Sequence, residues 1–333
     1  MTESTEVQDE AGTPPRKNLP LWQKLLPWLI TAACFAFLYT RLDAAAGREG
    51  QSLAQYLGGV FGKVSWPSWL ALMIPYSLFF FLVDSAVVWR AINWFNTKVR
   101  YRDILPIRGS SYILSILNEQ VGKGAMAVYL NRRDGVPGWE VGSSMLFIMF
   151  CEFYYLLAWA TLGYFLRGSS LPDEFSVIPY VAVAAMLLFV LFHAFFSGRI
   201  IKGGTLRQRP IFRAFREARA WQYGALILIR SPAMIGAVLV YTLALRLFGI
   251  EIEFGTMLGY LPLIFFGAAT PGPMRSVAIT LWVVLFPGNE GEMTAFGFVQ
   301  HNFFIFFNAA IGLLFLRRAN RELFGTRTPE PAP

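Results

Sequence analysis

Residues 256–287 read TMLGYLPLIFFGAATPGPMRSVAITLWVVLFP, and this stretch decides how the rest of the chain is interpreted. Two apolar halves flank the sequence Thr270-Pro271-Gly272-Pro273. Proline removes a backbone donor and glycine loosens a helix, so the segment is not expected to run straight through hydrocarbon. It predicts a re-entrant helical hairpin, with a kinked full span as the alternative.

Residues 104–130 have the same character, because ILPIRGSSYILS and AMAVYL enclose a polar centre, NEQVGKG. A second re-entrant hairpin is predicted here, with the same alternative. Residues 51–64 are shorter and amphipathic, which is typical of a helix lying along the membrane interface.

The composition indicates that much of the protein surface contacts a medium other than water. Of 333 residues, 55% are hydrophobic and 15% charged, whereas soluble domains carry about 25% charged residues. A spanning helix needs about 20 mostly apolar residues. Six segments meet this condition: 22–41, 67–89, 139–166, 176–197, 226–249 and 294–316.

The basic residues orient these segments. With both breaks folded as hairpins, 21 of the 29 Lys and Arg lie on one side and five on the other. The positive-inside rule makes the first side, and both termini, cytoplasmic. The surplus of +8 is therefore interpreted as orientation charge and not as a nucleic-acid patch. The predicted organisation is a disordered cytoplasmic tail (1–20), one transmembrane domain (21–322) and a C-terminal cytoplasmic tail (323–333).

This topology contains a symmetry. Two units have the order span, hairpin, span, and their hairpins dip from opposite faces, as in transporters built from inverted repeats. The predicted fold class is an all-α polytopic membrane protein with about six spanning helices plus two re-entrant hairpins in an inverted repeat. The units are 67–89, 104–130 and 139–166, and then 226–249, 256–287 and 294–316.

Ionisable groups at membrane depth indicate a site, because each costs about 2.5–3.5 kcal/mol on insertion scales. Glu119 and Lys123 flank the first break at i, i+4 spacing, beside Asn118. They either pair with each other or offer charge to a lipid headgroup. At the second break, Arg275 follows Pro271-Gly272 and begins the returning half-helix, which favours an anion site. The alternative is an arginine that snorkels outward.

Two spans carry further candidates. Glu152 lies in the middle of its span. It either has a functional role, pairs with a residue of another helix, or is protonated and hydrogen-bonded to a neighbour. His301 shares a helical face with Asn308, so these two either line a cavity or join helices by hydrogen bonds. The predicted substrate-binding residues are Asn118, Glu119, Lys123, Glu152, Pro271, Gly272, Arg275 and His301.

Other charges receive structural interpretations. Asp84 and Arg90 are expected to form a structural pair, or to anchor the helix at the interface, near the cytoplasmic end of their span. Arg108 is counted among the cytoplasmic charges, and Arg230 marks the point where an interfacial helix becomes a span. Enzyme signatures such as a P-loop or HExxH do not occur, and two histidines with two cysteines cannot form a Cys/His-rich zinc site. No cofactor and no metal are predicted.

The order of these features resembles the lysylphosphatidylglycerol synthase/flippase transmembrane-domain family, the membrane half of the multiple peptide resistance factor in its stand-alone form. The matching features are Asn118 to Gly124, the turn Asn131 to Gly135, and the proline-glycine break at Thr270 to Arg275. Pro273 and Arg275-Ser276-Val277 depart from the family's glycine-rich continuation, so the substrate is not carried over.

The resemblance implies a lipid translocase of the bacterial inner membrane, without the soluble aminoacyl-transferase domain. Its expected partner is a membrane lipid with an anionic or zwitterionic headgroup, and a homodimer is left open. One alternative is a membrane enzyme that transfers a group to or from a lipid-linked substrate, using Glu119, Glu152 and Asp84 as acid or base. Another is a scaffold that recruits a partner through the basic loop 199–219.

Overall fold

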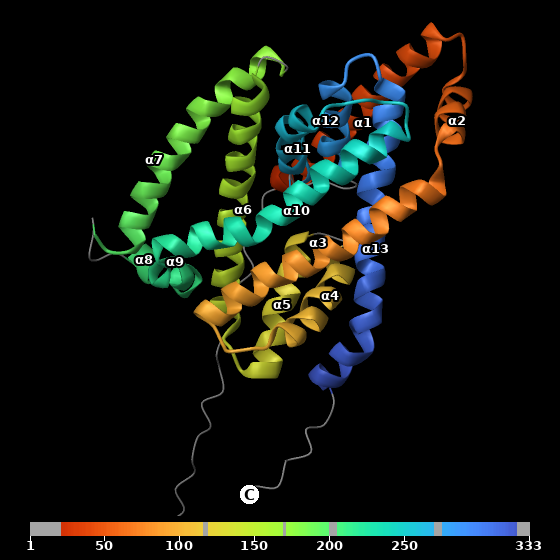
Figure 1. Cartoon of the computed structure of the whole chain (residues 1–333). Helices are drawn as coiled ribbons and strands as arrows, with labels where there is room; N and C mark the ends of the chain where they lie inside the picture. The colour runs from red at the N-terminus through yellow and green to blue at the C-terminus, as the bar shows by residue number, and fades with distance from the viewer. Residues whose placement is uncertain (1–20, 116–118, 169–170, 200–204, 270–274, 325–333) are drawn as a thin grey trace, which may run out of the picture.

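The computed structural model describes residues 21–115, 119–168, 171–199, 205–269 and 275–324. Within these ranges every regular element is helical and no strand occurs (Figure 1). The elements are α1 (Leu21–Arg48), α2 (Leu53–Lys63), α3 (Trp66–Phe95), α4 (Tyr101–Ser115), α5 (Glu119–Asp134), α6 (Gly138–Arg167), η2 (Asp173–Val177), α7 (Ile178–Phe196), α8 (Thr205–Gln208), η3 (Pro210–Phe212), α9 (Arg213–Glu217), α10 (Ala220–Arg246), α11 (Phe254–Ala269), α12 (Ser276–Leu285) and α13 (Glu290–Phe324).

Six stretches of the described chain are long and apolar enough to cross a membrane. They lie in α1, α3, α6, η2 with α7, α10 and α13, and each overlaps one predicted span. The structure therefore supports an all-α, multi-pass membrane protein. The predicted tail 1–20 and most of the tail 323–333 lie outside the described residues, while α13 continues to Phe324.

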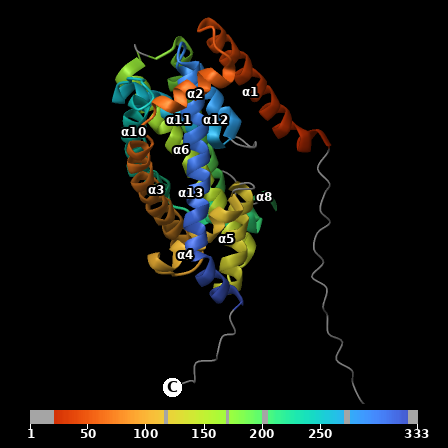
Figure 2. The ribbon, with the colours of Figure 1, turned by 90° about the vertical axis from the view of Figure 1, so that its right-hand side faces the viewer.

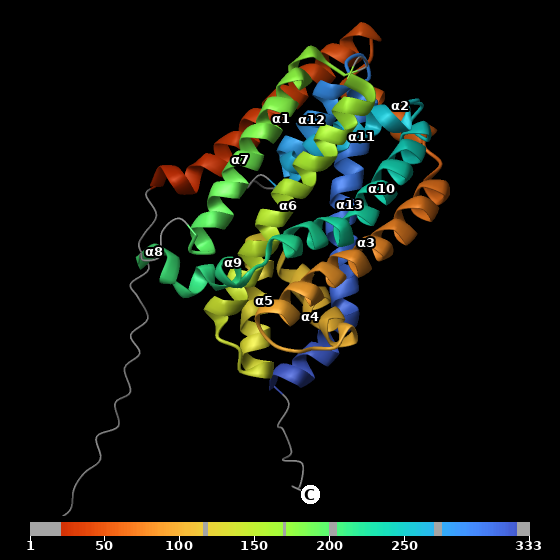
Figure 3. The same ribbon diagram turned by 60° about the vertical axis from the view of Figure 1, so that its left-hand side comes forward.

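The two broken segments each form a pair of short helices that pack against each other, α4 with α5 and α11 with α12. A proline lies inside the first helix of each pair, Pro106 in α4 and Pro262 in α11. The two pairs lie at opposite ends of the molecule, α4 and α5 at one end and α11 and α12 at the other (Figures 1 and 3).

The long helices α6 and α13 connect these two ends (Figure 3). The helix α4 packs on α13 and α5 packs on α6, whereas α11 packs on α6 and α12 packs on α13. The helices α3 and α10 pack on each other and complete the central bundle. The helix α1 contacts α12 and α13, and Figure 2 shows its N-terminal part leaning away from the bundle.

The surface of the bundle suits lipid. Only 17% of the apolar window over η2 and α7 is buried, and α7 leaves Tyr180, Val183 and Leu187 exposed. A helix that is apolar on all sides is stable when hydrocarbon surrounds it. The buried interior is rich in aromatic side chains, among them Trp69, Trp282 and Phe296, each at most 2% exposed.

Glycines allow two of the helix pairs to approach closely. A Cβ atom added to Gly163 of α6 would lie 2.6 Å from the Cα of Gly259 in α11. A Cβ atom on Gly312 of α13 would lie 2.5 Å from the carbonyl oxygen of Gly109 in α4. Small residues at helix crossings are the usual means of close backbone packing in membranes.

Substituting Gly163→Ala is expected to lower the free energy of unfolding by about 1–3 kcal/mol, because the backbone of α11 must move away. Thermal unfolding of the purified protein in detergent measures this. The matched control is Gly224→Ala in α10, where nothing lies within 4 Å of the added Cβ and alanine is the better helix former. Equal melting temperatures for the two variants would contradict the close contact between α6 and α11.

Candidate functional site

A cavity of about 130 Å³ lies between the helices of the central bundle. Residues of α3, α4, α6, α10, α11 and α13 line it, together with the residue that precedes α12. Five of the lining side chains carry a charge, and they come from different helices: Asp84, Arg108, Glu152, Arg230 and Arg275. In this cavity, charged side chains from both halves of the chain meet at the centre of an apolar bundle.

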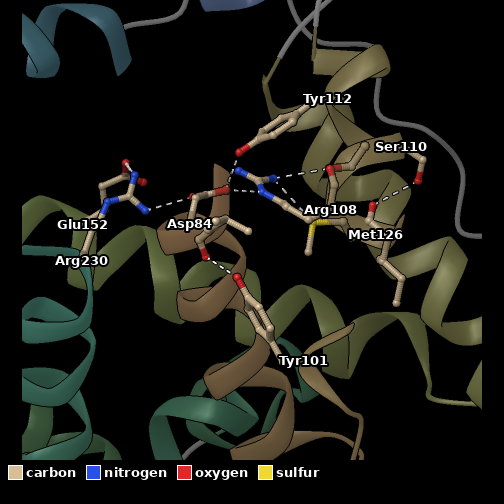
Figure 4. A network of polar contacts seen from close by, with 11 residues as sticks. Asp84, Tyr101, Arg108, Ser110, Tyr112, Met126, Glu152 and Arg230 are labelled. Carbon is tan, nitrogen blue, oxygen red and sulfur yellow. Dashed lines mark hydrogen bonds and ion pairs between the residues drawn. The ribbon is translucent and has the colours of Figure 1, made fainter. Parts of the chain in front are cut away.

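Asp84 of α3 is the centre of the charge network (Figure 4). Its side chain is 5% exposed. Its Oδ2 accepts hydrogen bonds from Nε of Arg108 at 2.5 Å and from the Tyr112 hydroxyl at 2.7 Å. Its Oδ1 accepts a hydrogen bond from Nη1 of Arg230 at 3.2 Å. One carboxylate thus holds α3, α4 and α10 together.

Arg230 connects this carboxylate to a second one. Its Nη2 donates to Oε1 of Glu152 in α6 at 2.5 Å. Its guanidinium also lies 5.6 Å from the ring centre of Tyr155 and 5.9 Å from that of Phe80. Aromatic faces attract a cation at such distances, so Arg230 is fixed by two carboxylates and two rings.

Arg108 extends the network to the α4 and α5 pair. Its guanidinium lies 4.6 Å from the ring centre of Tyr112. Its Nη1 lies 3.5 Å from Oγ of Ser111 and 3.6 Å from Sδ of Met126 in α5. Arg108 therefore connects both α4 and α5 to the carboxylate on α3.

Arg275 differs from the other two arginines. In the described part of the chain, no ion pair joins its side chain to a carboxylate, whereas Arg108 pairs with Asp84 and Arg230 pairs with both Asp84 and Glu152. Two carboxylates balance those two arginines, so the described cavity charges sum to one positive charge. Arg275 supplies that excess.

The backbone of Arg275 is also unusual, with φ 51° and ψ 39°. This left-handed conformation costs an L-residue about 1–2 kcal/mol, and Arg275 is the only non-glycine residue with positive φ in the described ranges. Such strain is retained mainly at functional sites. The residue directly precedes α12, where free backbone N–H groups add positive potential.

The α13 wall of the cavity is neutral and polar. Gln300, His301 and Asn308 are 2%, 1% and 6% exposed. Nε1 of Trp282 donates to Nε2 of His301 at 3.3 Å, and Nε2 of Gln300 donates to the Tyr241 hydroxyl. Oε1 of Gln300, Nδ1 of His301 and Oδ1 of Asn308 have no hydrogen-bond partner among the described atoms.

Three of the predicted site residues, Glu152, Arg275 and His301, line this one cavity. The backbones of Glu119 and Lys123 lie in α5, but their side chains are outside the description. Three other predicted residues lie outside the described residues altogether: Asn118, Pro271 and Gly272.

Three structural interpretations were wrong. Asp84 pairs with Arg108 and Arg230 and not with Arg90. Arg108 is 7% exposed inside the bundle and is not a cytoplasmic charge. Arg230 lies within α10, which begins already at Ala220, and does not mark the start of a span. Arg108 was assigned to the cytoplasmic face because it was counted with the basic residues that orient the spans. Arg230 was taken for a helix boundary because Ser231 and Pro232 follow it.

The sequence does contain a pattern that indicates buried positions for Arg108 and Arg230. Arg108 in ILPIRGSSYIL and Arg230 in LILIRSPAM interrupt apolar runs, and an arginine in such a run faces a bundle interior or an aqueous cavity. The number of apolar residues on both sides places each one at depth.

No family model, curated protein or solved structure matches the chain. The function is therefore inferred from the geometry of this cavity. Within the described ranges, no three His, Cys, Asp or Glu side chains are grouped to hold a metal ion.

Proposed function

We propose that the chain is a lipid translocase, in which the polar headgroup of a membrane lipid crosses the bilayer through the central cavity. The observation that carries the proposal is the cavity itself, where the described residues place five charged side chains with a net positive charge at the centre of an apolar bundle. Charges at membrane depth are costly and face a substrate path or one another. Arg275 has no carboxylate partner among the described residues, so a headgroup anion is the partner proposed for it.

We further propose that the bundle is an inverted repeat, which gives alternating access to this cavity. The helices α3, α4, α5 and α6 are matched with α10, α11, α12 and α13. Under this match the packing of α4 on α13 corresponds to that of α11 on α6, and α5 on α6 corresponds to α12 on α13. The contact between α3 and α10 is unchanged, because the match exchanges these two helices with each other. Transporters with inverted repeats bind substrate where the two repeats meet.

The positions of prolines support the same match. Pro75 in α3 and Pro106 in α4 are 31 residues apart, and Pro232 in α10 and Pro262 in α11 are 30 apart. Each hairpin proline follows a leucine, in Leu105-Pro106 and in Leu261-Pro262. Thirteen residues after each of these prolines, at the start of the returning helix, stand Glu119 and Arg275.

Two ion pairs at the ends of the bundle occupy matched positions. Arg167 at the end of α6 pairs with Glu253, next to α11, at 2.8 Å. Arg318 near the end of α13 pairs with Asp103 in the first turn of α4 at 3.1 Å. All four side chains are between 34% and 65% exposed, and exposed pairs contribute about 0.2–1 kcal/mol. Pairs this weak can break and re-form as each end opens in turn.

In the proposed cycle the two hairpins are re-entrant from opposite membrane faces, and the repeats rock about the cavity. The anionic part of the headgroup contacts Arg275, while the network of Asp84, Arg230 and Glu152 holds α3, α6 and α10 in register. A cavity of about 130 Å³ is smaller than the roughly 300–1,000 Å³ of pockets that enclose whole small-molecule ligands, so only the headgroup enters it and the acyl chains stay in the bilayer. The family resemblance and the charge bias extend this proposal to a bacterial inner membrane with both termini cytoplasmic.

The geometry favours this function over a membrane transferase. Asp84 and Glu152, the carboxylates that line the described cavity, are both paired with arginine. A general base needs a carboxylate that is free to take a proton from its substrate.

The test uses the purified protein in vesicles that contain a tail-labelled fluorescent phospholipid in both leaflets. Dithionite added outside bleaches only the outer leaflet. With a translocase, bleaching continues past half of the signal toward completion, whereas vesicles with heat-inactivated protein stop at half. Bleaching that stops at half for phospholipids with anionic and with zwitterionic headgroups would reject the function.

A further inference from the structure

We infer that the transported headgroup carries both an anionic group and hydrogen-bond donors, and that Gln300 and Asn308 select for the donors. The inference rests on the proposed function, because it concerns the ligand of the same cavity. It follows from which atoms of the cavity wall can donate a hydrogen bond and which can only accept one.

The anionic group is assigned to Arg275 and His301. An indole nitrogen can only donate, so the 3.3 Å contact from Trp282 requires Nε2 of His301 to accept. The neutral ring then carries its proton on Nδ1. This buried N–H has no partner in the described part of the chain, and both His301 and Arg275 line the cavity. Two donors, one of them positively charged, suit phosphate oxygens.

The donors of the headgroup are assigned to two amide oxygens. Nε2 of Gln300 is used by the Tyr241 hydroxyl, which leaves Oε1 of Gln300 facing no donor among the described atoms. Oδ1 of Asn308 is in the same position. Both side chains are at least nine-tenths buried and line the cavity. Carbonyl oxygens only accept, and buried polar atoms are nearly always paired, so we assign their partners to N–H or O–H groups of the ligand.

The spacing on α13 separates the two functions. His301 and Asn308 are seven residues apart, about 10 Å along the helix and nearly two full turns. They therefore share a face, with the anion contact at one level and an acceptor at another. The matching ligand is a phosphodiester headgroup that ends in a primary ammonium or in hydroxyls. A quaternary ammonium headgroup brings no N–H donor.

The experiment compares four tail-labelled lipids in the dithionite assay. Their headgroups are ethanolamine and glycerol, which have donors, and choline and a methyl phosphodiester, which have none. The wild-type protein is expected to translocate the donor-bearing lipid of each charge type at least tenfold faster than its donor-free counterpart. Equal rates within both pairs would overturn the inference and leave the proposed function standing. Failure to move any of the four lipids would reject the proposed function itself.

A variant assigns the selectivity to its residue. Asn308→Leu is expected to slow the ethanolamine lipid about tenfold and to bring the ethanolamine-to-choline ratio close to one. The matched control is Asn302→Leu on the same helix, since Asn302 does not line the cavity and its amide contacts the Phe298 carbonyl. The control should keep the wild-type ratio. Equal slowing of both lipids by Asn308→Leu would show general damage to the cavity and remove Asn308 from the assignment.

Discussion

Replacing Arg275 by glutamine is expected to slow lipid translocation about 10- to 100-fold. A hydrogen bond to a charged group contributes about 1.5–3 kcal/mol, and each 1.4 kcal/mol changes a rate about tenfold. The side chain is the cavity arginine without a carboxylate partner among the described residues, so its loss removes the anion contact without breaking an ion pair. The dithionite assay in vesicles measures the rate.

A second variant separates transport from folding. Glycine adopts the left-handed conformation of position 275 without strain. Arg275→Gly is therefore expected to be as stable as the wild type, or up to about 1 kcal/mol more stable, and still to lose transport. Wild-type rates in both variants would remove Arg275 from the site. A large loss of stability in the glycine variant would show that the side chain is structural.

Substituting Asp84→Asn is expected to lower the free energy of unfolding by about 3–5 kcal/mol, because it removes the buried negative charge that two buried arginines share. The side chain of Asp84 contacts Arg108, Arg230 and Tyr112 at once. Thermal or denaturant unfolding in detergent measures the loss. The matched control is Asp43→Asn on the exposed surface of α1, where a change below about 0.5 kcal/mol is expected.

A double variant identifies the cause of that loss. Asp84→Asn with Arg108→Gln is expected to be more stable than the sum of the two single changes predicts, by about 0.5–3 kcal/mol. The reason is that the second change removes one of the two guanidinium groups that contact the Asp84 carboxylate. Strict additivity would contradict the coupling between α3 and α4.

The sequence was sufficient for the long helices and for the second break. Apolar length predicts the six spans, and TPGP lies between the end of α11 and the start of α12. The first break was placed too late, because α5 begins at Glu119 and contains all of NEQVGKG except its first residue. These features are local, since they depend on residues that are neighbours in the chain.

The composition of the site was only partly predictable. Glu152, Arg275 and His301 stand out as polar residues in apolar surroundings, and they line one cavity. The partners of Asp84 did not follow from the sequence, because Arg230 is 146 residues away. Position along the chain suggested Arg90 instead. Tertiary packing determines which intramembrane charges form ion pairs, and spacing along the sequence does not predict pairs between distant helices.

The most direct measurement asks whether headgroups pass through this cavity. Ala269 lines the cavity, and its side chain is exposed. In a background where Cys34 and Cys151 are replaced, Ala269→Cys is treated with a bulky methanethiosulfonate, which forms a mixed disulfide with the thiol and releases methanesulfinate. Glu174→Cys on the exposed surface serves as the control. We predict that the reagent stops translocation in Ala269→Cys, that a reducing agent restores it, and that the control stays active. Undiminished translocation by fully labelled Ala269→Cys protein would contradict a path through the cavity.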